Sequence, residues 1–176
     1  MKEYSPEIIM NVLESSSTMI PINKGRALEG LAGYLFAQIE GFEEYGRNIV
    51  NSSRSSELDL VFSTNRHLSG LDFLDPVLFV ECKNTNASSD SADVSRFAGK
   101  IKRAGLSVGV LITSSGITGT DGWSAHREVQ EQLLMHGVKV LVVTGKDISG
   151  MKNTEQFKQM LKEKFMQLVV LGKVCS

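Results

Sequence analysis

The chain has 176 residues, of which 41% are hydrophobic, so it is long enough to bury a core and fits one globular domain. With 19 basic and 20 acidic side chains, its net charge of -1 excludes the general attraction to nucleic acid that basic domains have. Any binding of DNA or RNA must therefore depend on a local patch of charge.

The cysteines and the hydropathy pattern exclude further classes of protein. Cys82 and Cys175 are the two cysteines, and they provide neither a disulfide framework nor the paired ligands of a zinc site. No run approaches the roughly 20 apolar residues that span a bilayer, and the first residues lack a signal sequence. These features predict a soluble, cytoplasmic protein that does not associate with membranes.

The first predicted helix covers residues 7–13, after Ser5 as the N-cap and Pro6 at the first helical position. A polar run follows this helix. We therefore expect residues 1–20 to form a helical appendage with a linker, and residues 21–176 to form the main domain.

The second predicted helix covers residues 24–40 and ends at Gly41. Its apolar residues recur at helical spacing and form one stripe, which consists of Leu28, Leu31, Ala32, Leu35 and Ile39. Glu29 borders this stripe.

Strands and helices alternate in the rest of the chain. Alternating or apolar runs predict strands over residues 45–50, 57–62, 76–83, 107–113 and 138–143. Helical spacing predicts a helix after residue 90, a second after the glycine-rich turn at 114–122, and a last one from about residue 154. This order predicts an α/β fold with a central mixed β-sheet flanked by helices.

Acidic side chains interrupt two of the apolar strands, at Asp59 and at Glu81, and Lys83 follows Glu81 at strand spacing. Aspartate is uncommon in strands, and a buried charge is costly unless it is paired or binds a metal ion. Acid and lysine two residues apart usually form a simple ion pair. Placement inside apolar strands favours the alternative, a site for a divalent metal ion.

If the two strands are neighbours, Asp59 and Glu81 converge and offer carboxylate oxygens to Mg2+ or Mn2+, with the Cys82 backbone carbonyl as a further oxygen. Such a site suits phosphodiester hydrolysis, because a metal ion neutralises nonbridging oxygens and lowers the pKa of bound water. Lys83 would position the attacking water or stabilise developing charge. Glu29 would complete the outer shell or a second metal position.

These residues resemble the PD-(D/E)xK restriction-endonuclease-like nucleases, particularly their Mrr-type branch. Asp59 matches the first acid, Glu81-Cys82-Lys83 matches the E-x-K element, and Glu29 falls where many members have a helical glutamate. The resemblance covers nearly everything after Lys24, including the strand, turn, helix and strand that begin at Gly109. It implies a restriction-endonuclease-like core and a setting in restriction, anti-phage defence or DNA repair.

The chain departs from the Mrr-type pattern at two points. Many members have glutamine where this chain has Glu81, and many have a glycine shortly before the first acid, where this chain has Ser56-Glu57-Leu58. Neither difference removes a predicted metal ligand.

A basic stripe is predicted on the helix after Lys83, where Arg96, Lys100 and Arg103 recur at helical spacing. Such stripes are often only solvated helix faces, but this one follows the proposed active strand and is a candidate for contacts with phosphate groups. Asp72 and Asp75 lie in a loop, where aspartate commonly forms turns, and are not preferred as site residues.

Other catalytic classes fit the sequence poorly. The three histidines lack metal-ligand spacing, and the chain has no phosphate-binding loop with a following lysine and serine or threonine. Ser114-Ser115-Gly116 lacks the glycine pattern of a nucleophile elbow.

The prediction is therefore a Mg2+-dependent endonuclease that hydrolyses DNA, with Mn2+ as a possible substitute. One alternative is a nucleic-acid-binding or assembly module of the same fold, in which Glu81 and Lys83 only pair with each other. Another is a nuclease that resolves four-way DNA junctions, which would require a dimer. Sequence specificity would come from loops, a homodimer, a partner subunit or a domain outside this sequence.

Overall fold

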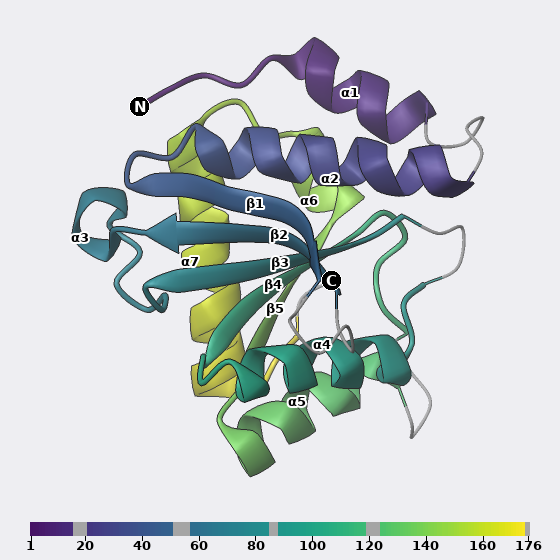
Figure 1. Ribbon diagram of the computed structural model, residues 1–176, viewed down its shortest axis with the longest axis vertical. Helices are drawn as coiled ribbons and strands as arrows, with labels where there is room; N and C mark the ends of the chain where they lie inside the picture. Colours follow the sequence, from purple (N-terminus) through teal and green to yellow (C-terminus); the bar gives the residue numbers. More distant parts are fainter. Residues whose placement is uncertain (16–20, 51–56, 85–87, 119–123, 175–176) are drawn as a thin grey trace.

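The computed structural model of the chain describes residues 1–15, 21–50, 57–84, 88–118 and 124–174. Its centre is a five-stranded mixed sheet in the order β1-β2-β3-β4-β5 (Figure 1). The strands are β1 (Phe42–Val50), β2 (Glu57–Thr64), β3 (Val77–Lys83), β4 (Val108–Thr113) and β5 (Lys139–Thr144). The first three strands are antiparallel neighbours, and β3, β4 and β5 are parallel.

Helices cover both faces of this sheet (Figure 1). They are α1 (Pro6–Ser15), α2 (Pro21–Ala37), α3 (Arg66–Ser69), α4 (Ser91–Arg103), α5 (Ala125–His136), α6 (Gly145–Ser149) and α7 (Thr154–Leu171). On one face, Phe36 of α2 packs against Phe62 of β2 and Phe157 of α7. The other face carries α4 and α5, so the predicted α/β fold with a mixed sheet flanked by helices is confirmed.

Close packing of α4 on the sheet depends on Gly109 in β4. A Cβ atom at this position would lie 2.4 Å from Cδ1 of Ile101 and 2.9 Å from Cζ of Phe97. Both of these α4 side chains are fully buried. The absence of a side chain at Gly109 therefore lets α4 lie directly on the sheet, beside the end of β3 where Glu81 and Lys83 lie.

The N-terminal segment packs on the main core. Tyr4 and Ile9 are buried in the same hydrophobic cluster as the sheet, and the Tyr4 hydroxyl donates to the Leu35 carbonyl over 2.9 Å. Glu3 forms an isolated antiparallel bridge with Asn153. The division into an appendage over residues 1–20 and a domain over residues 21–176 stays a prediction.

Most predicted elements occur, with shifted ends. The first strand begins at Phe42, before the predicted residue 45, and the second helix begins at Pro21, before residue 24. The short helices α3 and α6 were not predicted. Residues 16–20, 119–122 and Cys175 lie outside the described residues. No helix in the described part of the chain is long and apolar enough to cross a bilayer.

Candidate active site

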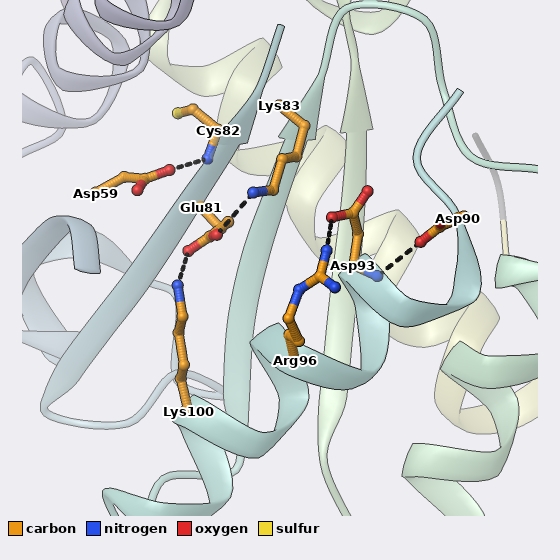
Figure 2. Close-up of polar contacts among 8 residues, drawn as sticks. All are labelled: Asp59, Glu81, Cys82, Lys83, Asp90, Asp93, Arg96 and Lys100. Atoms are coloured by element: carbon orange, nitrogen blue, oxygen red, sulfur yellow. Dashed lines mark hydrogen bonds and ion pairs between the residues drawn. The ribbon is translucent and has the colours of Figure 1, made fainter. Parts of the chain in front are cut away.

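An open cleft of about 420 Å³ lies where α4 passes the ends of β2 and β3. Its lining contains two carboxylates from the neighbouring strands, Asp59 and Glu81, together with Lys83. The remaining lining residues are Glu57, Ser95, Arg96, Gly99, Lys100 and Arg103. The structure therefore brings the predicted acids and cations of β2, β3 and α4 into one site. Figure 2 shows all of them except Arg103, namely Asp59, Glu81, Lys83, Arg96 and Lys100.

Asp59 occupies the point where pairing between β2 and β3 stops. The last paired residues at this end are Leu60 and Val80, and beyond them the Cys82 backbone N–H donates to Oδ2 of Asp59 over 2.7 Å. The Asp59 side chain thus takes the place of a backbone carbonyl of β2 as the acceptor for the Cys82 N–H (Figure 2). This hydrogen bond fixes the carboxylate between the two strands.

Burial, and after it the negative charge of Glu81, raise the pKa of Asp59 to about 6, although the hydrogen bond from the Cys82 N–H and the charge of Lys100 act to lower it. A carboxylate stabilised by a structural ion pair would have a lowered pKa instead. Asp59 therefore carries charge that its protein surroundings do not compensate. Perturbed acids of this kind occur at functional sites.

The raised pKa gives Asp59 a predicted effect on stability. The folded protein holds this proton more tightly than the unfolded chain, so the group's favourable contribution is complete below its ordinary pKa of 3.8 and is lost as the pH rises through about 6. Asp59→Asn should therefore stabilise the metal-free protein at pH 8 by about 1 kcal/mol, a value reduced for partial exposure. Thermal unfolding of both proteins between pH 4 and pH 8 measures this, and a gap that does not widen with pH would contradict it.

Glu81 is buried between two ammonium groups (Figure 2). Nζ of Lys83 lies 3.2 Å from Oε1 of Glu81, and Nζ of Lys100 lies 2.6 Å from Oε2. The predicted neighbour relation of Glu81 and Lys83 on one strand face thus holds, and α4 supplies the second cation. Two positive charges offset the cost of burying this carboxylate.

Lys83 remains a cation in this site. Burial acts to lower the pKa of Lys83, but the charge of Glu81 and the hydrogen bond to it act in the other direction, and the pKa ends above its usual value. A group that keeps its proton cannot serve as a general base at neutral pH. Lys83 is therefore suited to orient a water molecule or to stabilise negative charge.

The Cys82 side chain is buried, and burial raises the pKa of its thiol well above the usual value. Its backbone amide is the group that contacts Asp59. The role of the Cys82 carbonyl as a metal ligand stays a prediction.

The three predicted phosphate-binding cations of α4 differ in their contacts. Lys100 binds Glu81, and Arg96 forms an ion pair with Asp93 on its own helix (Figure 2). Arg103 is exposed and lines the cleft. All three border the same cavity, but their contact with phosphate stays a prediction.

Glu29 lies on α2 and is not among the described residues that line the cleft. Its Oε2 accepts a hydrogen bond of 3.2 Å from the side-chain amide of Asn48 on β1. Its charge still contributes to the raised pKa of Asp59, after burial and Glu81. The structure therefore places Glu29 within electrostatic reach of the site, and its catalytic role stays a prediction.

Asn48 adopts a left-handed backbone conformation, with φ of 50°, inside β1. The register pairs Arg47 with Leu60 and Ile49 with Leu58, so Asn48 lies opposite Asp59. Asparagine tolerates this conformation better than other residues with a Cβ atom, and glycine tolerates it best. Backbone strain of this kind clusters at functional sites.

Two substitutions separate the conformation of Asn48 from its side-chain contact. We expect Asn48→Ala to lower the free energy of unfolding by about 1 kcal/mol, because alanine is disfavoured at positive φ. Asn48→Gly loses the same hydrogen bond but keeps the conformation, so it should be clearly more stable than Asn48→Ala. Urea unfolding of the two variants gives the comparison, and equal stability would contradict the role of the backbone.

Some lining residues were not predicted as site residues. Glu57 shares a strand face with Asp59, and Gly99 and Ser95 lie one and two helical turns before Arg103. The two-residue and four-residue spacings were signals that could have identified them. Asp75 lies before β3, at the end away from Lys83, where it accepts hydrogen bonds from the backbone amides of Ser107 and Val108.

Histidine, cysteine, aspartate and glutamate side chains do not gather in groups of three or more that could hold a metal ion within the described ranges. The acids that line the cleft are Glu57, Asp59 and Glu81.

The fold is an α/β domain with a mixed five-stranded sheet, and its cleft gathers two carboxylates and a lysine at the ends of two strands. The Mrr_cat model, which describes a restriction endonuclease, matches residues 23–151, more than half of the chain. The chain therefore belongs to the Mrr_cat restriction endonuclease family, and the predicted resemblance is confirmed. This family is described as restriction endonucleases, a class of protein that acts on DNA.

Among solved structures, the DNA modification-dependent restriction endonuclease AspBHI is similar to the chain, with a TM-score of 0.41 and 16% sequence identity. The match covers 97% of this chain and 41% of that protein, so the chain spans less than half of its length. No curated protein sequence matches the chain.

Proposed function

We propose that the cleft between β2, β3 and α4 hydrolyses phosphodiester bonds of DNA with the help of Mg2+, for which Mn2+ can substitute. The observation that carries this proposal is the convergence of Asp59 and Glu81 with Lys83 at the end of two adjacent strands. Membership of the restriction endonuclease family supports the same reaction class.

The residues present fit a divalent cation. Asp59 and Glu81 offer hard carboxylate oxygens, and two carboxylates completed by water and phosphate oxygens are a usual ligand set of Mg2+. A cation would also relieve the repulsion between these acids that contributes to the raised pKa of Asp59. When bound there, it would neutralise charge on the scissile phosphate and lower the pKa of a coordinated water.

The chain's own residues would perform the remaining tasks. The Cys82 amide holds Asp59 in place, so the acid is oriented before any ligand binds. Lys83, a permanent cation beside Glu81, would orient the attacking water or stabilise charge on the phosphate. Arg103, which is exposed and lines the cleft, would contact a neighbouring phosphate and position the DNA backbone.

Cleavage of supercoiled plasmid tests this proposal. The purified chain should nick or linearise the plasmid with Mg2+ or Mn2+, and EDTA should stop the reaction. Linear duplex and four-way junction substrates, compared in the same assay, separate a general endonuclease from a junction-resolving enzyme. Lack of cleavage of every substrate with both metal ions would contradict the proposed activity.

One observation favours a second candidate, a DNA-binding or assembly module without catalysis. Both oxygens of Glu81 are satisfied by lysines, as a structural ion-pair network would require. A module without catalysis does not explain why Asp59 is buried beside Glu81, where its pKa is raised. It predicts DNA binding that does not change when Mg2+ is added, which a gel-shift assay with and without EDTA measures.

A role in restriction, anti-phage defence or DNA repair is proposed from the family. Target specificity would come from loops, a homodimer, a partner subunit or a domain outside this sequence.

A further inference from the structure

Lys100 makes the closer of the two ion pairs of Glu81. Its Nζ lies 2.6 Å from Oε2 of Glu81, and its side chain is only 15% exposed, whereas that of Lys83 is 30% exposed. Lys100 comes from α4, which the glycine at position 109 allows to lie directly on the sheet. The ion pair of Lys100 and Glu81 therefore connects helix α4 to the sheet, whereas the ion pair of Lys83 and Glu81 lies within strand β3.

The four central groups carry no net charge when they are counted together, although both ammonium groups pair with Glu81 and neither pairs with Asp59. Asp59 and Glu81 contribute two negative charges, and Lys83 and Lys100 contribute two positive charges. A divalent cation added to this set would be repelled by both ammonium groups over a few ångströms, in surroundings where charges interact strongly. It would also compete with Lys100 for Oε2 of Glu81, since that oxygen already accepts a short hydrogen bond.

Lys100 has an alternative partner within the same cleft. It lies between Arg96 and Arg103 on α4, one turn from each, and all three line the cavity. A long lysine side chain has several rotatable bonds, so its ammonium group can leave Glu81 without movement of the helix. A phosphate group in the cleft would accept a hydrogen bond from the Lys100 ammonium group once this group has left Glu81.

We propose that Lys100 is a positioning residue that holds Glu81 in the metal-free protein, and that it exchanges Glu81 for a DNA phosphate when the divalent cation binds. This inference rests on the proposed metal site. Metal binding and DNA binding then support each other. The cation becomes the partner of Glu81 when Lys100 moves to the DNA, and the DNA phosphate becomes the partner of Lys100 when the cation displaces it from Glu81. In the absence of DNA, Lys100 keeps the affinity for metal low.

Calorimetric titration of the DNA-free protein with Mn2+ tests this exchange. Lys100→Met should bind Mn2+ about tenfold more tightly than the wild type, because the competing cation is gone. Arg103→Met is the matched control, because it removes a positive charge from the same cleft and the described contacts of Glu81 do not include Arg103. Its affinity should stay within about twofold of the wild type.

A second readout separates exchange from general loss of structure. Metal-free Lys100→Met should melt at a lower temperature than the wild type, since Glu81 loses a buried partner, and Mn2+ should restore more of its stability than it adds to the wild type. Lys100→Gln, which can still donate to Glu81, serves if the methionine variant does not fold, and it should also bind Mn2+ more tightly than the wild type.

The outcomes distinguish this inference from the function on which it rests. If the wild type binds Mn2+ and the neutral variants at position 100 bind it equally or more weakly, Lys100 only supports the site and the exchange is wrong. The same holds if Arg103→Met tightens binding as much as Lys100→Met does. If no protein shows heat of binding or a thermal shift with Mn2+, the proposed metal site itself is wrong.

Discussion

Asp59→Asn is expected to reduce metal-dependent DNA cleavage at least about a thousandfold, which corresponds to roughly 4 kcal/mol of transition-state stabilisation. The change is nearly isosteric, and the amide oxygen can still accept the hydrogen bond from the Cys82 N–H. Only the negative charge and one hard ligand oxygen are lost. Initial rates of plasmid nicking with Mg2+ measure the effect.

Asp72→Asn is the matched control for this substitution. Asp72 lies in the loop before β3, its side chain is 78% exposed, and its contact with His67 is at 4.0 Å. Removal of its charge should leave cleavage unchanged. If Asp59→Asn retains more than about a tenth of the wild-type rate, the site does not depend on this carboxylate and the proposed mechanism fails.

Lys83→Met should reduce the rate constant for cleavage about a hundredfold, while DNA affinity changes by only a few fold. The reason is that Lys83 remains charged beside Glu81, where it can act on charge that develops during the reaction. Methionine preserves the length and most of the apolar packing of the side chain. Single-turnover cleavage gives the rate constant, and fluorescence anisotropy in EDTA gives the affinity.

Lys102→Met provides the comparison for Lys83→Met. Lys102 is exposed on α4, and its Nζ lies 3.1 Å from Nδ1 of His136 on α5, outside the cleft lining. Its loss should affect neither quantity strongly. A Lys83→Met protein that cleaves at the wild-type rate but binds DNA weakly would show that Lys83 only attracts the substrate.

Strand periodicity was sufficient to predict that Asp59, Glu81 and Lys83 lie together in one candidate site. Asp59 and Glu81 interrupt apolar runs, and alternation of side chains put Lys83 on the same face as Glu81. The order of strands and helices followed from the same patterns and is confirmed. These features are local, so the sequence around each residue contains the necessary information.

The contacts between elements could not be predicted in this way. Helical spacing grouped Lys100 with Arg96 and Arg103, but it could not show that Lys100 reaches Glu81, because this depends on how closely α4 approaches the sheet. The left-handed conformation of Asn48 was also hidden, since asparagine occurs in many turns and strands with ordinary φ values. Both features depend on tertiary packing.

The most direct test of the central claim is the position of a divalent cation in a crystal of the protein soaked in Mn2+. Anomalous diffraction should show a manganese peak in the cleft at about 2.1 Å from a carboxylate oxygen of both Asp59 and Glu81. A peak elsewhere, or none beside Asp59 in crystals of a preparation that cleaves DNA with Mn2+, would contradict the account.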